Sequence, residues 1–216
     1  MRGLSRPARL AGLAAIALAA LAAGYYFGQD LPAPEPTAPP APVASQVPEV
    51  RPVFTLADAE GRPRSITEWD GKALIINFWA TWCPPCRREI PSLNALRAEY
   101  LPRGFEVVGV AVDFRDDVVA YMNGTPIDYP VLIGEQDGLD AARAFGMETI
   151  GFPFTIFTDR AGRIVTVHVG ELHRPEAALI LSAVEDVSAG RLDMEAARAR
   201  IRAGMASLKQ QDTGAK

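Results

Sequence analysis

The amino-acid sequence predicts an α/β domain in which helices flank a central β-sheet. Two nearly unbroken apolar runs of strand length, residues 73–80 and 105–112, indicate strands that are covered on both faces. Between these runs, apolar residues recur at the spacing of one helix face, at Ile90, Leu93, Leu96 and Tyr100. A strand, a helix and a second strand at this spacing are typical of a parallel β-α-β unit.

The following segments extend this architecture. Residues 154–158 and 163–169 flank a glycine-containing turn and predict a β-hairpin. Residues 175–187 fit a closing helix with Pro175 near its first turn. The segment between the second strand and the hairpin, residues 113–147, contains two short helix candidates and one short apolar run, at 118–122, 139–145 and 130–133.

The start of the chain predicts an export signal or a membrane anchor within residues 1–28. Arginines precede an uncharged stretch of 19 residues, residues 10–28, that ends in three aromatic side chains. Such aromatic residues are typical of a membrane interface, so an uncleaved signal anchor is favoured over a cleaved signal peptide. Because the arginines lie only on the N-terminal side, the positive-inside rule places the rest of the chain outside the cytoplasm.

Three further regions are expected after this segment. Residues 29–52 contain eight prolines and predict a semi-rigid linker. Residues 53–190 form the predicted folded body. Residues 191–216 predict a C-terminal helical tail with a narrow apolar stripe at Met194, Ala197, Ile201, Met205 and Leu208. This tail either packs on the body or frays as a surface helix, or it docks a partner.

Composition excludes several classes of protein. The chain has 216 residues, of which 49% are hydrophobic, so it can bury a core. Its formal net charge of −4 argues against nucleic acid as the main partner. Its two cysteines can form neither a disulfide-rich scaffold nor a four-cysteine zinc site.

Those cysteines, Cys83 and Cys86, lie directly after the first strand and before the helical pattern. Unsatisfied N–H groups at the start of a helix stabilise a thiolate, so Cys83 is the expected nucleophile. Cys86, one turn away, is placed to resolve a mixed disulfide. An inert disulfide and half of a metal site are the alternatives, but a loop this short stabilises little and the sequence offers no second ligand pair.

Two segments around this pair resemble a known family. Residues 77–91 and 151–163 are similar to the active-site segment and the Pro-Thr strand of the TlpA/ResA/CcmG-like thioredoxin-fold oxidoreductases. The resemblance covers about residues 53–187. It implies a thioredoxin fold with a central insert, a membrane tether and a periplasmic location. It also implies that the redox-active group is the Cys83–Cys86 disulfide, without a metal or a bound cofactor.

The resemblance assigns roles to individual residues. Cys83 would be the exposed nucleophile and Cys86 the resolving thiol, while Pro153 matches a cis-proline across from them. Glu89 matches an acid near the dithiol, although it could instead be a first-turn helical acid that favours the dipole. Residues expected to contact the client are Trp82, Pro84, Pro85 and Phe152, although Trp82 could instead be buried.

Two positions differ from ordinary thioredoxin. Asn77 stands where thioredoxin has its buried aspartate, so Glu89 could take over part of that role. Pro84 and Pro85 cannot donate an N–H to the Cys83 sulfur, which leaves the Cys86 N–H. A weaker thiolate favours a reductant over an oxidant. Both histidines, His168 and His173, are expected at the surface.

The resulting hypothesis is a periplasmic reductase of disulfides in exported client proteins. By resemblance, these clients include apocytochrome c and copper-site proteins, and a membrane-embedded donor supplies the electrons. The protein would be held at the inner membrane through residues 10–28. One alternative is a thiol peroxidase, disfavoured because Ala80 and Ile76 stand where peroxidases have Thr or Ser and proline. Another is a non-catalytic copper-binding adaptor that uses the two sulfurs.

Overall fold

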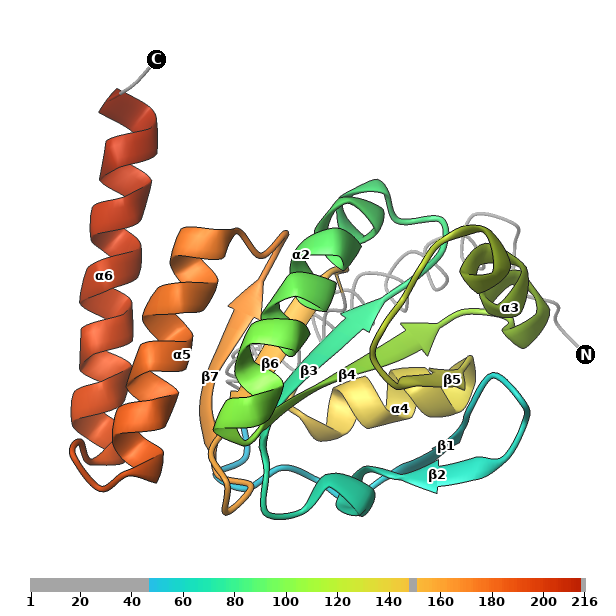
Figure 1. Ribbon diagram of the computed structural model, residues 1–216, viewed down its shortest axis with the longest axis horizontal. Coiled ribbons are helices and arrows are strands. Elements are labelled where there is room, and N and C mark those ends of the chain that lie inside the picture. The colour runs from blue at the N-terminus through green and yellow to red at the C-terminus, as the bar shows by residue number, and fades with distance from the viewer. Residues whose placement is uncertain (1–46, 148–150, 215–216) are drawn as a thin grey trace, which may run out of the picture. The chain divides into compact units, whose positions relative to one another are not determined.

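The computed structural model describes residues 47–147 and 151–214, which form an α/β domain around one sheet (Figure 1). The seven strands lie in the order β2-β1-β5-β4-β3-β6-β7. The centre is parallel and contains β3 (Ala73–Trp79), β4 (Phe105–Val112) and β5 (Val131–Gly134). Strands paired antiparallel surround it: β1 (Thr55–Ala57), β2 (Pro63–Ser65), β6 (Phe154–Thr158) and β7 (Ile164–Val169). The predicted fold class, the two long strands and the hairpin are confirmed.

Helices cover both faces of the sheet. The face that contains Ile75 and Trp79 is covered by α2 (Pro84–Tyr100), α3 (Arg115–Gly124) and α5 (Arg174–Ser188). The other face packs against α4 (Gln136–Ala144) and the short helix η1 (Ile66–Trp69). A second short helix, η2 (Leu101–Arg103), links α2 to β4. Every residue of β3 and β4 is buried, which explains why their sequences are almost continuously apolar.

One row of paired residues crosses the sheet beneath α2. Asn77 on β3 pairs with Gly109 on β4 and with Thr155 on β6. Thr155 in turn pairs with His168 on β7. Directly paired residues point to the same face of a sheet, so the side chains of this row share the face covered by α2 and α5.

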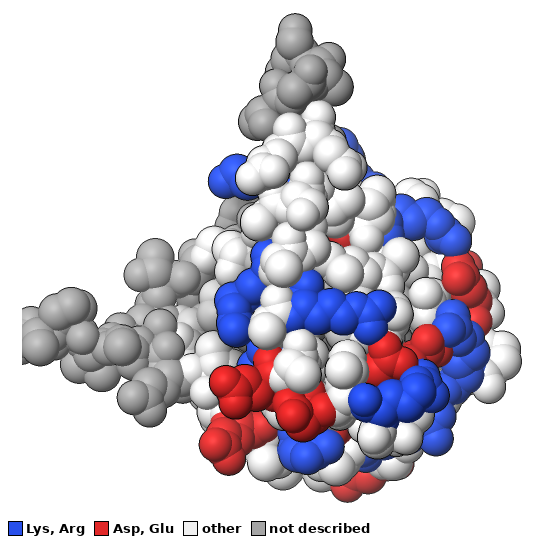
Figure 2. Space-filling model, turned by 90° about the vertical axis from the view of Figure 1, so that its left-hand side faces the viewer, with Lys and Arg blue, Asp and Glu red and all other residues white. Residues whose placement is uncertain are grey.

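The predicted tail forms α6 (Met194–Gly214), which lies along α5 and reaches β7. Ala197 and Ile201 from its apolar stripe are buried in the same core as α2 and α5. The Arg198 guanidinium donates hydrogen bonds to the carbonyls of Val165 and Ile164. Figure 2 views this side of the domain, where basic and acidic side chains lie next to one another. The first half of α6 is therefore packed against the body, which was the first of the alternatives predicted for the tail.

The described chain begins at the end of the sheet opposite the start of α2. The Glu49 carbonyl accepts a hydrogen bond from the Ile164 N–H at 2.8 Å, and the Arg51 N–H donates to the Gly162 carbonyl at 2.8 Å. These bonds attach the end of the predicted linker to the turn between β6 and β7. The predicted anchor, residues 10–28, lies outside the described residues. Within the described ranges, the structure contains no helix with the length and apolarity that a membrane span requires.

The close packing above Gly109 yields a prediction about stability. A Cβ at this position would lie 2.9 Å from Tyr129 Cε2 and 3.2 Å from Trp79 Nε1. Because both rings are buried, Gly109→Ala should lower the free energy of unfolding by about 1 to 3 kcal/mol, measured by denaturant titration. Gly124→Ala is the matched control, since its Cβ would meet no atom within 4 Å. Equal stabilities for the two variants would contradict the prediction.

Candidate redox site

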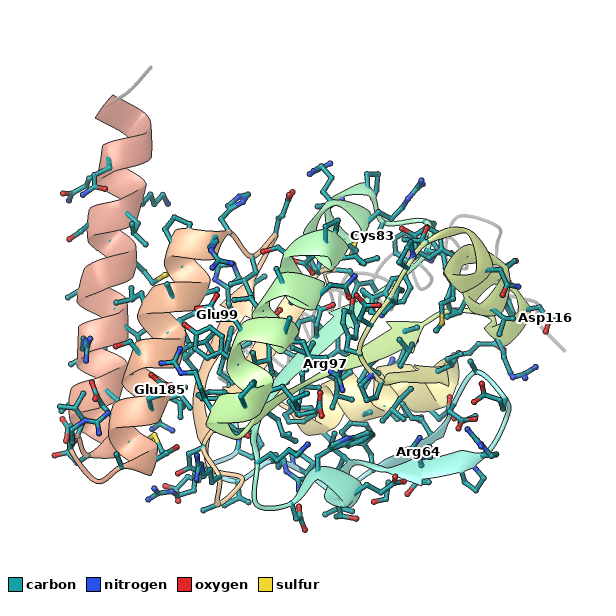
Figure 3. The ribbon with its side chains drawn as sticks, in the orientation of Figure 1. Arg64, Cys83, Arg97, Glu99, Asp116 and Glu185 are labelled. Carbon is teal, nitrogen blue, oxygen red and sulfur yellow. A yellow bond between two sulfur atoms is a disulfide. The ribbon has the colours of Figure 1, made fainter. Side chains whose placement is uncertain are left out.

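A cysteine pair begins helix α2. Cys83 is the N-cap residue, and it forms a disulfide with Cys86 across a Cα–Cα distance of 5.3 Å. Pro84 and Pro85 take the first two helical positions, where their missing N–H groups leave no intrahelical bond unmade. The Cys86 N–H therefore faces the Cys83 sulfur, at an N···S distance of 3.3 Å. Figure 3 shows Cys83 at the upper end of α2, beyond the end of the sheet.

The disulfide is more enclosed than expected. Cys83 exposes 3% of its surface and Cys86 none. The expectation of an exposed Cys83 is therefore wrong for the oxidised protein, because both residues belong to the core beneath α2. Cys83 is still the more accessible of the two. Since disulfide exchange uses only the two sulfurs and the partner's sulfurs, this site needs no bound cofactor.

Aromatic and proline residues border the disulfide end of the sheet. Trp82 is 65% exposed, so the buried alternative is wrong for this side chain. Its ring meets Phe152 edge-on, with the ring centroids 5.9 Å apart. The Phe152–Pro153 peptide bond is cis, as expected, and the Pro153 carbonyl accepts a hydrogen bond from the Gly170 N–H at 2.8 Å. Because β6 runs antiparallel to β3, Pro153 and Cys83 lie at the same end of the sheet. Client contact by Trp82, Phe152, Pro84 and Pro85 stays a prediction.

Glu89 is a buried acid on the second turn of α2, so it is not the first-turn helical acid of the alternative interpretation. One carboxyl oxygen accepts a hydrogen bond from the Asn77 side-chain amide at 2.7 Å. The other accepts from the Leu172 backbone N–H at 2.8 Å. Cys86 and Glu89 are three residues apart on the helix, a spacing that places side chains next to each other.

The surroundings of Glu89 make its carboxyl group easy to protonate. Burial raises the pKa of Glu89 to about 7, although the hydrogen bonds from Leu172 and Asn77 oppose the shift. Among its charged neighbours, Glu171 raises the pKa further and His173 lowers it. Glu89 can therefore exchange a proton near neutral pH, which is the property that a general acid or base requires.

Asn77 is the main link between this acid and the sheet. Its amide nitrogen donates to Glu89 and also to the Thr155 hydroxyl, at 3.0 Å. A neutral amide at this position cannot act as a carboxylate base, but it holds the Glu89 carboxylate in place. The proposal from the sequence that Glu89 acts where thioredoxin uses its aspartate is thus compatible with the geometry.

Asp113, for which no role was predicted from the sequence, holds the segment before Cys83. Asp113 follows β4 and accepts hydrogen bonds from the Thr81 backbone N–H at 3.0 Å and from its hydroxyl at 2.5 Å. An aspartate at the carboxyl end of a parallel strand lies next to the end of the neighbouring strand, and this was the available signal. Asp113 thereby ties the segment after β4 to the segment that carries Trp82.

The two histidines differ in their surroundings. His173 is exposed, as expected, and is the N-cap residue of α5. The expectation for His168 is wrong, because only 9% of its side chain is exposed. Thr166 and His168 share one face of β7, as the alternating pattern indicated, but this face lies toward the core that α5 and α6 cover. Over the ranges that the structure describes, no three or more His, Cys, Asp or Glu side chains are grouped so that they could hold a metal ion.

Comparisons with known proteins agree with this geometry. The sequence model of the redoxin family matches residues 42–181. The thiol-disulfide oxidoreductase ResA of Halalkalibacterium halodurans is 34% identical over 136 residues, which cover 57% of this chain and 75% of that relative. The thioredoxin-like protein YneN of Bacillus subtilis is 32% identical over 131 residues, which cover 58% and 72%. A crystal structure of a thiol:disulfide interchange protein of the thioredoxin family from Chlorobium tepidum TLS has 35% identity and a TM-score of 0.52, covering 58% of this chain and 88% of that one.

The raised pKa of Glu89 predicts a specific dependence of stability on pH. Its ordinary value is 4.5 and its value in the folded protein is about 7. Protonated Glu89 therefore contributes stability that is fully present below about pH 4.5 and is lost as the pH rises through about 7. Between these values, the free energy of unfolding of the oxidised wild type should fall by about 2 to 3 kcal/mol more than that of Glu89→Gln. Denaturant titrations at several pH values measure the difference, and parallel curves would refute the assignment.

Proposed function

The chain belongs to the redoxin family and is a thioredoxin-fold thiol-disulfide oxidoreductase of the ResA type, and on this premise we propose that it reduces disulfides in exported client proteins. The Cys83–Cys86 pair is the proposed electron carrier. Glu89 and the cis-proline Pro153 complete the proposed reaction site.

The observation that carries this proposal is the buried carboxyl group next to the resolving cysteine. Cys86 is fully buried, and its thiol must lose a proton before its sulfur can attack. Glu89 lies one helical turn further along and titrates near neutral pH. Since the Cys86 side chain is shielded from solvent, a neighbouring protein group is the natural proton acceptor.

The reaction then proceeds in two exchanges. The Cys83 thiolate attacks one sulfur of the client disulfide, which forms a mixed disulfide and releases the other client sulfur as a thiolate. Cys86 transfers its proton to Glu89, and the resulting thiolate attacks the Cys83 sulfur. This step releases the second client sulfur and forms the Cys83–Cys86 disulfide seen in the structure. The client gains two electrons, the enzyme loses two, and protonation of the client thiolates completes the balance.

The prolines support electron flow toward the client. Pro84 and Pro85 remove two of the backbone donors that would otherwise face Cys83, and the bond from the Cys86 N–H remains. Fewer donors stabilise the thiolate less, and a less stabilised reduced form is the stronger reductant. The reduction potential of the pair should therefore be closer to that of thioredoxin than to that of a strongly oxidising member of the fold.

The proposed location follows from the sequence. Residues 10–28 would anchor the protein in the inner membrane and hold the redox domain in the periplasm. Because that compartment is oxidising, a reducing pair needs a continuous electron supply, for which we propose a membrane-embedded donor. The proposed clients are exported proteins with cysteine pairs, with apocytochrome c and copper-site proteins as the classes to examine first.

Trapping of mixed disulfides tests the proposed function. In Cys86→Ser, the Cys83 thiolate can attack a client, but the product cannot be resolved, so clients should accumulate in a covalent complex with Cys83. Non-reducing electrophoresis followed by mass spectrometry identifies them. Cys83→Ser is the matched control and should trap far less. Equal trapping by both variants would contradict the assigned roles.

The reduction potential tests the direction of electron flow. The reduction potential of the wild-type pair should be closer to that of thioredoxin, about −270 mV, than to that of the oxidant DsbA, about −120 mV. Pro85→His adds a backbone N–H and a titratable ring near Cys83, so it should raise the potential by tens of millivolts. Equilibration with glutathione buffers measures both proteins. A wild-type potential above about −150 mV would indicate a disulfide donor instead.

A further inference from the structure

The loop that follows β7 completes the surroundings of Glu89. Residues 170–173 connect β7 to α5, and the Leu172 N–H in this loop donates directly to the buried carboxyl group. The neighbouring side chains of Glu171 and His173 influence the pKa of Glu89 in opposite directions. Any shift of this loop would therefore change the hydrogen bonding and the charge around Glu89.

His168 ties this loop to the sheet. Its Nε2 lies 3.3 Å from the Glu171 carbonyl oxygen, so Nε2 donates a hydrogen bond to the residue immediately before Leu172. The same nitrogen lies 3.8 Å from a carboxyl oxygen of Glu176 on α5. That Glu176 oxygen also accepts the His173 N–H at 2.9 Å. The loop is thus held on both sides of Leu172, by His168 before it and by Glu176 after it.

His168 lies on a strand of the sheet, so its position is fixed relative to Asn77. It pairs with Thr155, which pairs with Asn77, and Asn77 is the second donor to Glu89. Both hydrogen bonds to Glu89 therefore depend on residues of the same row across the sheet. Asn77 makes its bond directly, whereas His168 acts through the Leu172 backbone.

The charged groups around His168 come from several elements. Glu171 and His173 belong to the loop, while Glu176 belongs to the first turn of α5. Lys209 on α6 lines the same groove of about 980 Å³ that borders His168, together with the apolar side chains of Met205 and Leu208. On the other side, Thr155 separates His168 from Asn77 and the acid.

We propose that His168 is a positioning residue for the redox reaction, and that it fixes the Leu172 N–H against Glu89 through the Glu171 carbonyl. The inference rests on the proposed role of Glu89 as the proton acceptor of Cys86, and it extends that site to the strand at the sheet's edge. In this role His168 acts on the reaction only through Leu172 and Glu89.

Two amide variants separate this role from general packing. In His168→Gln the amide nitrogen reaches the position of Nε2, whereas in His168→Asn it reaches only the position of Nδ1. Both variants are polar and uncharged, and both avoid the cavity that alanine would leave. Thr166→Ala is the control, because Thr166 lies on the same strand but pairs with Phe157, away from the loop.

The readout is the titration of the Glu89 side-chain carboxyl carbon by NMR in the full-length oxidised protein, with the signal assigned through Glu89→Gln. Loss of the His168 bond should loosen the loop and weaken the charge-assisted bond from Leu172. His168→Asn should therefore raise the pKa of Glu89 by about 1, while His168→Gln and Thr166→Ala keep it near the wild-type value. Equal values for the Asn and Gln variants, whether shifted or not, would overturn the inference.

A second measurement distinguishes this inference from the proposed function. If Glu89 accepts the proton of Cys86, the acidic limb of the pH profile of insulin reduction should move to higher pH in His168→Asn together with the NMR titration. A displaced titration with an unmoved pH profile would refute the role of Glu89 in turnover while supporting the positioning by His168. An unmoved titration would refute the positioning by His168 whatever the pH profile shows.

Discussion

A single carboxyl group, removed from water and held between two N–H donors, connects the main parts of this domain. Glu89 comes from the first long helix, Asn77 from the central strand and Leu172 from the loop before α5. Such a group is costly to bury unless its oxygens accept hydrogen bonds. The helix, the strand and the loop must therefore be correctly placed relative to one another. The arrangement couples the packing of the core to the protonation of the site.

The ends of several strands supply the remainder of the site, and each contributes something different. Cys83 follows β3 and begins α2, Asp113 follows β4 and holds Thr81, and Pro153 precedes β6. In a parallel sheet the carboxyl ends of neighbouring strands meet at one edge, which is where ligand and reaction sites form in α/β proteins. The structure therefore places the cysteine pair at the end of the sheet, where the segments next to three strands surround it.

Patterns with a strong local cause could be predicted from the sequence. The unbroken apolar strands, the helix after Cys83, the hairpin and the cysteine pair all follow from periodicity or from fixed spacing, and the structure contains them. The short strands β1 and β2 were not predicted, because three residues are too few to show a period. The burial of His168 and the contact between Leu172 and Glu89 depend on how distant elements pack. Neither could be deduced from local patterns, since residues 89 and 172 meet only when the loop after β7 closes over α2.

The attachment of Glu49 and Arg51 to the turn between β6 and β7 has a mechanical consequence. That turn lies at the start of β3, whereas the cysteine pair lies beyond its end, and a strand of this length separates the two by about 20 Å. The chain that arrives from the N-terminus therefore joins the domain at its rear with respect to the reactive sulfurs. A pull on residues 49–51 would be borne by the hairpin turn at this end of the sheet, and not by the segments that carry the cysteine pair.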